Sequence, residues 1–131
     1  MLDTDTCIYL INRRDRSLQT TFQRHAEAIC ISAISHAELC YGVEHSNRVG
    51  RNRHALTEFL SDLDVVSFDQ TAGTHYGQLR ETLTREGTPI GGNDLLIAAH
   101  ARSIPAVLVT NNEKEFGRVP DLETENWLAE V

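Results

Sequence analysis

Several features are missing from this sequence of 131 residues, and each absence excludes a class of protein. No apolar run is long enough to cross a bilayer, and no leader of charged and then apolar residues stands at the N-terminus. We therefore expect a cytoplasmic protein that does not associate with a membrane. Basic residues are also scarce, since 12 Lys and Arg stand against 19 Asp and Glu, for a formal net charge of -7. This balance argues against tight non-specific binding to nucleic acid through bulk charge, although it allows a local basic patch.

Motifs that bind metal through Cys or His are absent as well. The three cysteines, Cys7, Cys30 and Cys40, are odd in number and show no C-x-x-C spacing. We interpret them as small buried apolar residues in a reducing compartment. The six histidines are scattered without an H-E-x-x-H pattern, which is typical of ordinary surface or core histidines.

The length and the 40% apolar content predict one globular domain over residues 1–131. Short runs typical of β-strands alternate with helical patterns, which predicts βαβ units around a parallel sheet and hence an α/β fold. These runs cover residues 1–3, 28–33, 65–68 and 106–110. The tail from residue 121 is expected to add a short edge strand or to pack Trp127 on the body.

Helical spacing of apolar residues predicts the connections between these strands. The first crossover, 4–25, is expected to be helical with a break near Arg13–Ser17, and two helices broken near 44–52 are expected between the second and third strands. A further amphipathic helix is expected over about 71–86, with Gly87 as its stop. Its apolar stripe consists of Ala72, Tyr76, Leu79 and Leu83.

The segment "PIGGNDLLIAAHA", residues 89–101, places Asp94 at the start of a helix that is apolar on almost every face. Asp is a preferred N-cap residue, so position alone favours a capping role. However, Asn93 caps equally well, so one of the two side chains is spare. A carboxylate at the entrance of a buried helix is costly unless something compensates it, which leaves a chemical role open.

Other polar side chains are expected to meet Asp94 at one edge of the sheet. Asp3 and Thr110 end the first and last predicted strands, and ligands of parallel sheets bind beyond these carboxyl ends. Glu38 lies four residues after Ile34 and three before Tyr41, which predicts that it shares the inward face of its helix. Carboxylates crowded together need a cation between them, and an all-oxygen set selects Mg²⁺ or Mn²⁺. The sequence therefore predicts metal-assisted hydrolysis of a phosphate ester. Glu115 or Glu113 is expected to complete the set of oxygen ligands around the ion.

One resemblance is to the haloacid dehalogenase-like phosphatases. "LDTDT" (2–6) resembles their D-x-D-x-T loop, with Asp3 as nucleophile and Asp5 as acid/base, and "VLVTNN" (107–112) resembles their threonine strand. In that family a lysine and a further acidic motif follow this strand. Here only 21 residues follow Thr110, with Lys114 as the sole lysine. This alternative, a phosphomonoesterase, also leaves Glu38 and Asp94 without a role.

Nearly the whole chain resembles the PIN-domain ribonucleases, specifically the VapC-like toxins of toxin–antitoxin pairs. Four segments match theirs in the family order: "MLDTDTCIYLI", "CISAISHAELCYGVEHS", "YGQLRETLTREGTPIGGNDLLIAAHA" and "LVTNNEKEFGRVPDLETENWL". The resemblance implies a three-layer α/β/α sandwich with a central parallel sheet. It also implies that Asp3, Glu38 and Asp94 form an acidic triad that binds Mg²⁺ and activates water, with Asp3 and Asp94 as the foremost metal ligands.

The same resemblance assigns the residues around the triad. The family's fourth acid falls at or near Asn112, so Asn112 would ligate or hydrogen-bond while Glu115 supplies the missing charge. Thr4 and Thr110 would orient carboxylates and water. Asp5 would add an outer acid or cap the first helix, and Arg80 would contact a phosphate or simply be a solvated arginine.

Partners follow only from the resemblance. It implies an RNA substrate, a homodimer and a cognate antitoxin whose segment blocks the acidic pocket. An alternative from another class is a catalytically silent antitoxin-binding module that keeps the acids for Mg²⁺-dependent stability. The expectation we carry forward is a Mg²⁺-dependent endoribonuclease acting as the toxin of a type II toxin–antitoxin pair.

Overall fold

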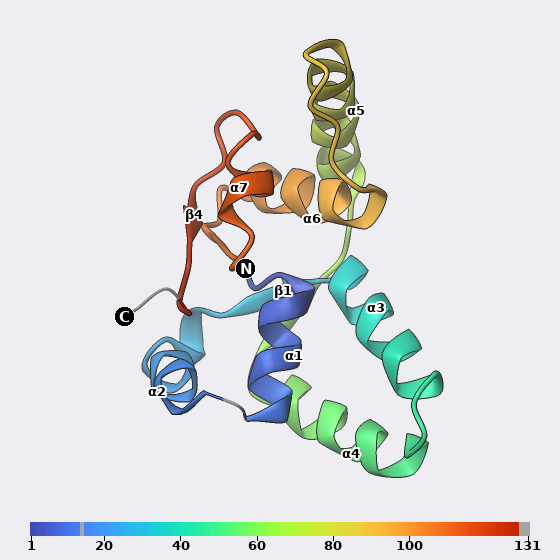
Figure 1. The fold of residues 1–131 in the computed structure, drawn as a ribbon, viewed down its shortest axis with the longest axis vertical. Coiled ribbons are helices and arrows are strands. Elements are labelled where there is room, and N and C mark those ends of the chain that lie inside the picture. Colours follow the sequence, from blue (N-terminus) through green and yellow to red (C-terminus); the bar gives the residue numbers. More distant parts are fainter. Residues whose placement is uncertain (14, 129–131) are drawn as a thin grey trace.

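The computed structural model describes residues 1–13 and 15–128 (Figure 1). Its helices are α1 (Thr4–Asn12), α2 (Arg16–Arg24), α3 (Ala33–Glu44), α4 (Val49–Leu60), α5 (Gln70–Arg85), α6 (Gly92–Ser103) and the short α7 (Glu113–Phe116), with one 3₁₀ turn over Ala26–Ala28. Its strands are β1 (Cys30–Ser32), β2 (Asp64–Val66), β3 (Leu108–Val109) and β4 (Thr124–Glu125). The predicted alternation of strands and helices is confirmed, with strands shorter than expected.

The strands form one parallel sheet through Leu2. β1 pairs with β2 and β3 pairs with β4, while Leu2 bridges to Ile31 on one side and to Val109 on the other. The order across the sheet is therefore β2, β1, Leu2, β3, β4, and it reverses at Leu2. Such a reversal opens a crevice beyond the carboxyl ends of the strands, where open α/β sheets bind ligands. Asp3 stands at this point.

The sheet separates two hydrophobic cores because successive strand side chains point to opposite faces. Met1 and Leu108 belong to the core under α5 and α6, whereas Leu2 and Val109 belong to the core under α1 to α4. Figure 1 shows the same division, with α5 and α6 on one side of the chain start and α1, α3 and α4 on the other. The predicted α/β/α sandwich is confirmed.

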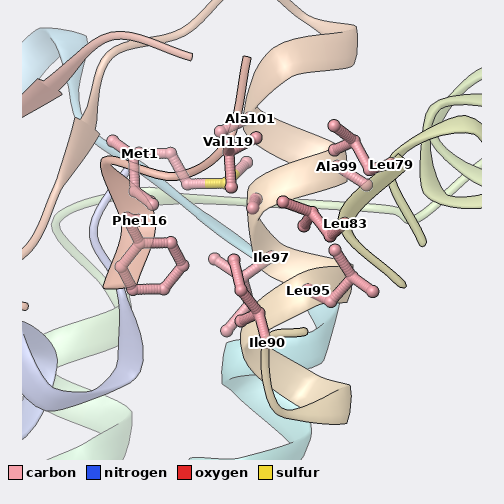
Figure 2. Packing of buried hydrophobic residues seen from close by; sticks show 12 residues of the cluster. Met1, Leu79, Leu83, Ile90, Leu95, Ile97, Ala99, Ala101, Phe116 and Val119 are labelled. Carbon is pink, nitrogen blue, oxygen red and sulfur yellow. The ribbon is translucent and has the colours of Figure 1, made fainter. Parts of the chain in front are cut away.

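Helix α6 is the central element of the first core. Its expected burial is confirmed, since the side chains of Leu95, Ile97, Ala98, Ala99, His100 and Ala101 are all buried. Figure 2 shows Leu79 and Leu83 of α5 facing it on one side and Phe116 on the other. The packing holds the first turn of α6, with Asp94, in a fixed place relative to the sheet.

Most predicted helix limits are confirmed. α5 buries Ala72, Leu79 and Leu83 of the expected stripe and ends before Gly87, whose φ of 73° is the left-handed conformation that glycine favours. The inward face predicted for α3 from Ile34 and Tyr41 was wrong, because Tyr41 is 67% exposed and the buried residues are Ser35, Leu39 and Val43. The true stripe is shifted by one residue from the predicted one, so Glu38 lies beside it rather than within it.

Both expectations for the tail hold. β4 is a short edge strand, and the Trp127 ring stacks on His25 with centroids 5.4 Å apart. Residues 129–131 lie outside the described part. Cys7 is buried as expected, whereas Cys30 and Cys40 are only half-buried, and all three are free thiols. Among the described helices, none has the length and apolar content to cross a membrane.

Candidate functional site

A small polar pocket of about 70 Å³ lies at the reversal of the sheet. Its lining comes from four separate parts of the chain and consists of Asp3, Thr4, Asp5, Glu38, Asp94, Asn112 and Phe116. The structure thus brings together all three acids of the predicted triad, with Asn112 beside them. We call this site the acidic pocket.

Asp3 is held by the start of α1. Its side chain is the N-cap of that helix, since the Thr6 backbone N–H donates to Asp3 Oδ1 over 2.9 Å. Asp3 is only 4% exposed, and this burial raises the pKa of its carboxyl, an effect opposed by hydrogen bonds from Thr110 and Thr6. Asp3 therefore has a structural role as a cap, which the sequence had suggested for Asp5 as an alternative. Asp5 does not cap α1 and stands exposed in its first turn.

Glu38 reaches the pocket from α3 and is fixed by two donors. The Thr4 hydroxyl donates to Glu38 Oε1, and the Asn93 side-chain amide donates to Glu38 Oε2 over 3.1 Å. Thr4 Oγ1 also lies 3.1 Å from the Ser35 hydroxyl. Helices α1, α3 and α6 are therefore joined by hydrogen bonds at this carboxylate.

Asp94 does not cap its helix, so the capping alternative is wrong. α6 begins at Gly92 with Gly91 as N-cap and no side-chain cap bond, which leaves Asp94 in the first turn. The pKa of Asp94 is raised to about 7, first by burial, then by the charge and hydrogen bond of Glu115, and then by the charges of Glu38 and Asp3. The crowding of acids predicted from the sequence is thus expressed at Asp94.

Asn112 lines the acidic pocket on the side of α7, and Glu115 lies next to Asn112. Asn112 is the N-cap of α7, and its amide donates to Glu115 Oε2 over 3.1 Å. Glu115 is the acid next to the triad, because its charge and hydrogen bond raise the pKa of Asp94. Glu113, the alternative predicted from the sequence, is exposed. The buried Thr110 hydroxyl accepts from the Asn112 backbone N–H over 2.9 Å, which leaves its own proton for Asp3.

Arg80 is not brought to the acidic pocket. It lies exposed on α5, where its guanidinium donates to the Tyr76 hydroxyl over 3.1 Å.

Asn93 is a residue of the site that the sequence analysis did not identify. It contacts Glu38, although the sequence suggested only a helix cap for it. Its place one residue before Asp94 is the signal that could have pointed to it.

His100 is a buried contact that the sequence did not reveal. It is 1% exposed on α6, and its Nδ1 lies 2.7 Å from the hydroxyl of Ser32, the N-cap of α3. Nε2 has no hydrogen-bond partner among the described residues. The pair links the helix that carries Asp94 to the helix that carries Glu38.

We expect the contribution of His100 to the free energy of unfolding to fall as the pH drops below about 6.5, measured as the difference between wild-type protein and His100→Asn. Burial lowers its pKa in the folded protein, opposed in part by the Asp69 charge and the Ser67 carbonyl, so the unfolded chain takes up the proton first. The stabilisation is complete above the unfolded pKa and is lost as the pH falls through the folded one. Urea unfolding at a series of pH values should show the free energy of unfolding of wild-type protein falling relative to that of His100→Asn, whose side chain at this position cannot titrate. A difference in the free energy of unfolding that does not change with pH would contradict the assignment.

The family model of the PIN domain matches residues 1–122 of this chain. The tRNA(fMet)-specific endonuclease VapC of Shigella flexneri is 43% identical over 127 residues, which cover 97% of this chain and 96% of that protein. Ribonuclease VapC2 of Haemophilus influenzae is 43% identical over 128 residues, which cover 98% of this chain and 97% of that protein.

Solved structures show the same likeness in three dimensions. VapBC2 from Rickettsia felis, bound to a DNA fragment from its promoter, superposes with a TM-score of 0.93 at 44% identity and covers 97% of both chains. DNA-bound VapBC from Salmonella typhimurium superposes with a TM-score of 0.94 at 42% identity, covering 97% of this chain and 96% of that one. With its acids at the reversal of a parallel sheet, this chain belongs to the PIN-domain family, among the VapC proteins.

Proposed function

We propose that this protein is a Mg²⁺-dependent endoribonuclease that hydrolyses RNA phosphodiester bonds and acts in the cytoplasm as the toxin of a type II toxin–antitoxin pair. The observation that carries the proposal is the meeting of Asp3, Glu38 and Asp94 in one pocket at the reversal of the sheet. Relatives above 40% identity are named as endonuclease and ribonuclease, which supports RNA as the substrate.

The chemistry of the donors fits a hard divalent ion. The polar lining consists of carboxylate, hydroxyl and amide groups without Cys or His, and about 70 Å³ suits an ion with its waters rather than an organic ligand. Burial, followed by the negative charges of neighbouring acids, raises the pKa of Asp94, and a cation would relieve the repulsion between these charges. Asp3 and Asp94 would hold Mg²⁺ (or Mn²⁺), with Glu38 next, and Asn112 and Glu115 would complete the set.

The carboxylates of the acidic pocket do not surround a single metal position in this structure. In the described part of the chain, no three Asp, Glu, His or Cys side chains lie close enough together to hold one ion. Glu38 is turned to the Thr4 hydroxyl and the Asn93 amide.

When bound, a divalent ion lowers the pKa of a water and neutralises charge on the phosphate. The chain supplies the positions around it. The Thr4 hydroxyl and the Asn93 amide orient Glu38, the Thr110 hydroxyl orients Asp3, and the core under α6 fixes Asp94. The buried face of Asp3 excludes water from one side of the pocket.

The proposed function also implies protein partners and a further contact with RNA. The neighbouring structures named VapBC support a small antitoxin as partner, and we propose a homodimer of chains that each form one domain over residues 1–131. Arg80, which lies outside the acidic pocket, is proposed to contact a phosphate further along the RNA.

Incubation of the purified, antitoxin-free protein with total cellular RNA tests the activity. We expect discrete fragments with Mg²⁺ and intact RNA with EDTA, because the acids repel one another and the phosphate without a cation. Intact RNA in both reactions, from a protein that Mg²⁺ stabilises against heat, would contradict the nuclease and favour the silent binding module. Release of phosphate from monoesters, abolished by Asp5→Asn and retained by Asp94→Asn, would favour the phosphomonoesterase.

A further inference from the structure

A second concavity, which we call the side hollow, adjoins the acidic pocket. It measures about 620 Å³, within the range of about 300–1,000 Å³ common to small-molecule sites. Thr4, Asp5 and Glu38 line both concavities, so a molecule can occupy the two together. The side hollow is therefore within reach of any group attached to a phosphate in the acidic pocket.

The most exposed large apolar side chain of the described residues faces this hollow. Tyr41 lines it and is 67% exposed, and Ile8 beside it is 44% exposed. The Tyr41 ring stacks on the His45 ring, with centroids 5.3 Å apart and planes inclined by 15°. This contact restricts the orientation of Tyr41 although neither ring is buried. The core of α3 is complete without it, because Ser35, Leu39 and Val43 form the buried stripe.

The charge of the side hollow indicates which part of a nucleotide fits. Among the described residues, its polar lining includes the carboxylates of Asp5 and Glu38 and no Lys, Arg or His. A phosphate there would be repelled by both acids and would gain no cation. A nucleobase is neutral and planar, and bases of single-stranded RNA stack on aromatic side chains regardless of sequence.

We propose that the side hollow is a nucleobase subsite in which Tyr41 stacks against the base of a nucleotide next to the scissile bond. The inference rests on the proposed function, because it places the cleaved phosphate in the acidic pocket. Tyr41 is then a substrate-positioning residue, and it acts on binding of the RNA rather than on attack by water. The apolar side chains of Ile8 and Ile34 would cover the edges of the base, and Asn93 supplies a side-chain amide of the lining for the polar rim of the base.

The test combines a change in the protein with a change in the RNA. The probe is a single-stranded oligoribonucleotide that carries the mapped cleavage bond, made intact or with one flanking nucleotide abasic. We expect Tyr41→Leu to raise the KM for the intact oligonucleotide about tenfold with little change in kcat, because base–aromatic stacking is lost. Tyr41→Phe is the matched control, since it keeps the ring and should retain the KM. Neither change affects a buried residue, so the fold is preserved.

The abasic oligonucleotide separates stacking from other effects of the substitution. With the base next to Tyr41 removed, wild-type protein should show the same raised KM, and Tyr41→Leu should raise it no further. Equal effects of Tyr41→Leu on intact and abasic oligonucleotides, or an unchanged KM for both, would overturn the subsite and favour a protein partner for this surface. A wild-type protein that cuts no RNA would instead overturn the proposed function, and the subsite with it.

Discussion

Asp94→Asn is expected to abolish cleavage of RNA, by at least about a hundredfold in kcat, while the fold is retained. The amide keeps the size of the side chain but removes one of the negative charges that would hold the ion. Because Asp94 caps nothing, no helix contact is lost with the charge. Cleavage is measured on total RNA with Mg²⁺ under the conditions that give discrete fragments with wild-type protein.

The same substitution should make the metal-free protein more stable at neutral pH. A folded pKa of about 7, against 3.8 for the ordinary group, means that the folded chain binds the proton more tightly, so stability is lost as the pH rises from about 4 to about 7. Asp94→Asn removes that loss, and after allowance for solvent screening of a half-buried group we expect a gain of about 1–2 kcal/mol at pH 8 with EDTA. Mg²⁺ should then stabilise wild-type protein more than the variant.

An exposed aspartate outside the pocket supplies the control for both readouts. Asp62→Asn changes the net charge by the same amount in the turn before β2, so it should leave cleavage and the response to Mg²⁺ unchanged. Undiminished cleavage by Asp94→Asn would remove Asp94 from the metal site. A loss of cleavage together with a loss of stability would show a structural role in place of a chemical one.

The fold was largely predictable because local sequence and long-range packing agree. Alternation of strand and helix patterns led to the parallel sheet, and Gly87 marked the end of α5. The extent of the strands was not predictable, since the first apolar run contributes only Leu2 to the ladder. Asp3 already caps α1, so the chain leaves the sheet one residue earlier than the apolar pattern suggests.

The acids of the site could be predicted from the sequence, whereas the contacts around them could not. Position at strand ends and helix starts suggested that Asp3, Glu38 and Asp94 meet at one edge of the sheet, and all three line the acidic pocket. The contact of His100 with Ser32 spans 68 residues and depends on how α6 packs against β1. The exposure of Tyr41 depends on the rotation of α3, for which Ile34 and Tyr41 suggested the wrong face.

Asp3 is expected to show two separable roles when it is replaced by Asn and by Ala. Both variants should lose at least about a hundredfold in cleavage, because each removes the carboxylate from the acidic pocket. Asn caps a helix as well as Asp does, so Asp3→Asn should keep the bond from the Thr6 N–H, whereas Asp3→Ala should be less stable than Asp3→Asn by about 1 kcal/mol. Urea unfolding with EDTA measures this difference.

The burial of Asp3 also predicts how the stability of Asp3→Asn compares with that of wild-type protein. Because burial raises its pKa, the ionised carboxylate lowers stability as the pH rises above the ordinary value of 3.8, and Asp3→Asn should be at least as stable as wild type at neutral pH without metal. A variant that is stable, capped and inactive would separate the chemistry of Asp3 from its structural role. Cleavage by Asp3→Asn at the wild-type rate would reduce Asp3 to a helix cap, and the acidic pocket would then lack the ligand at the reversal of the sheet.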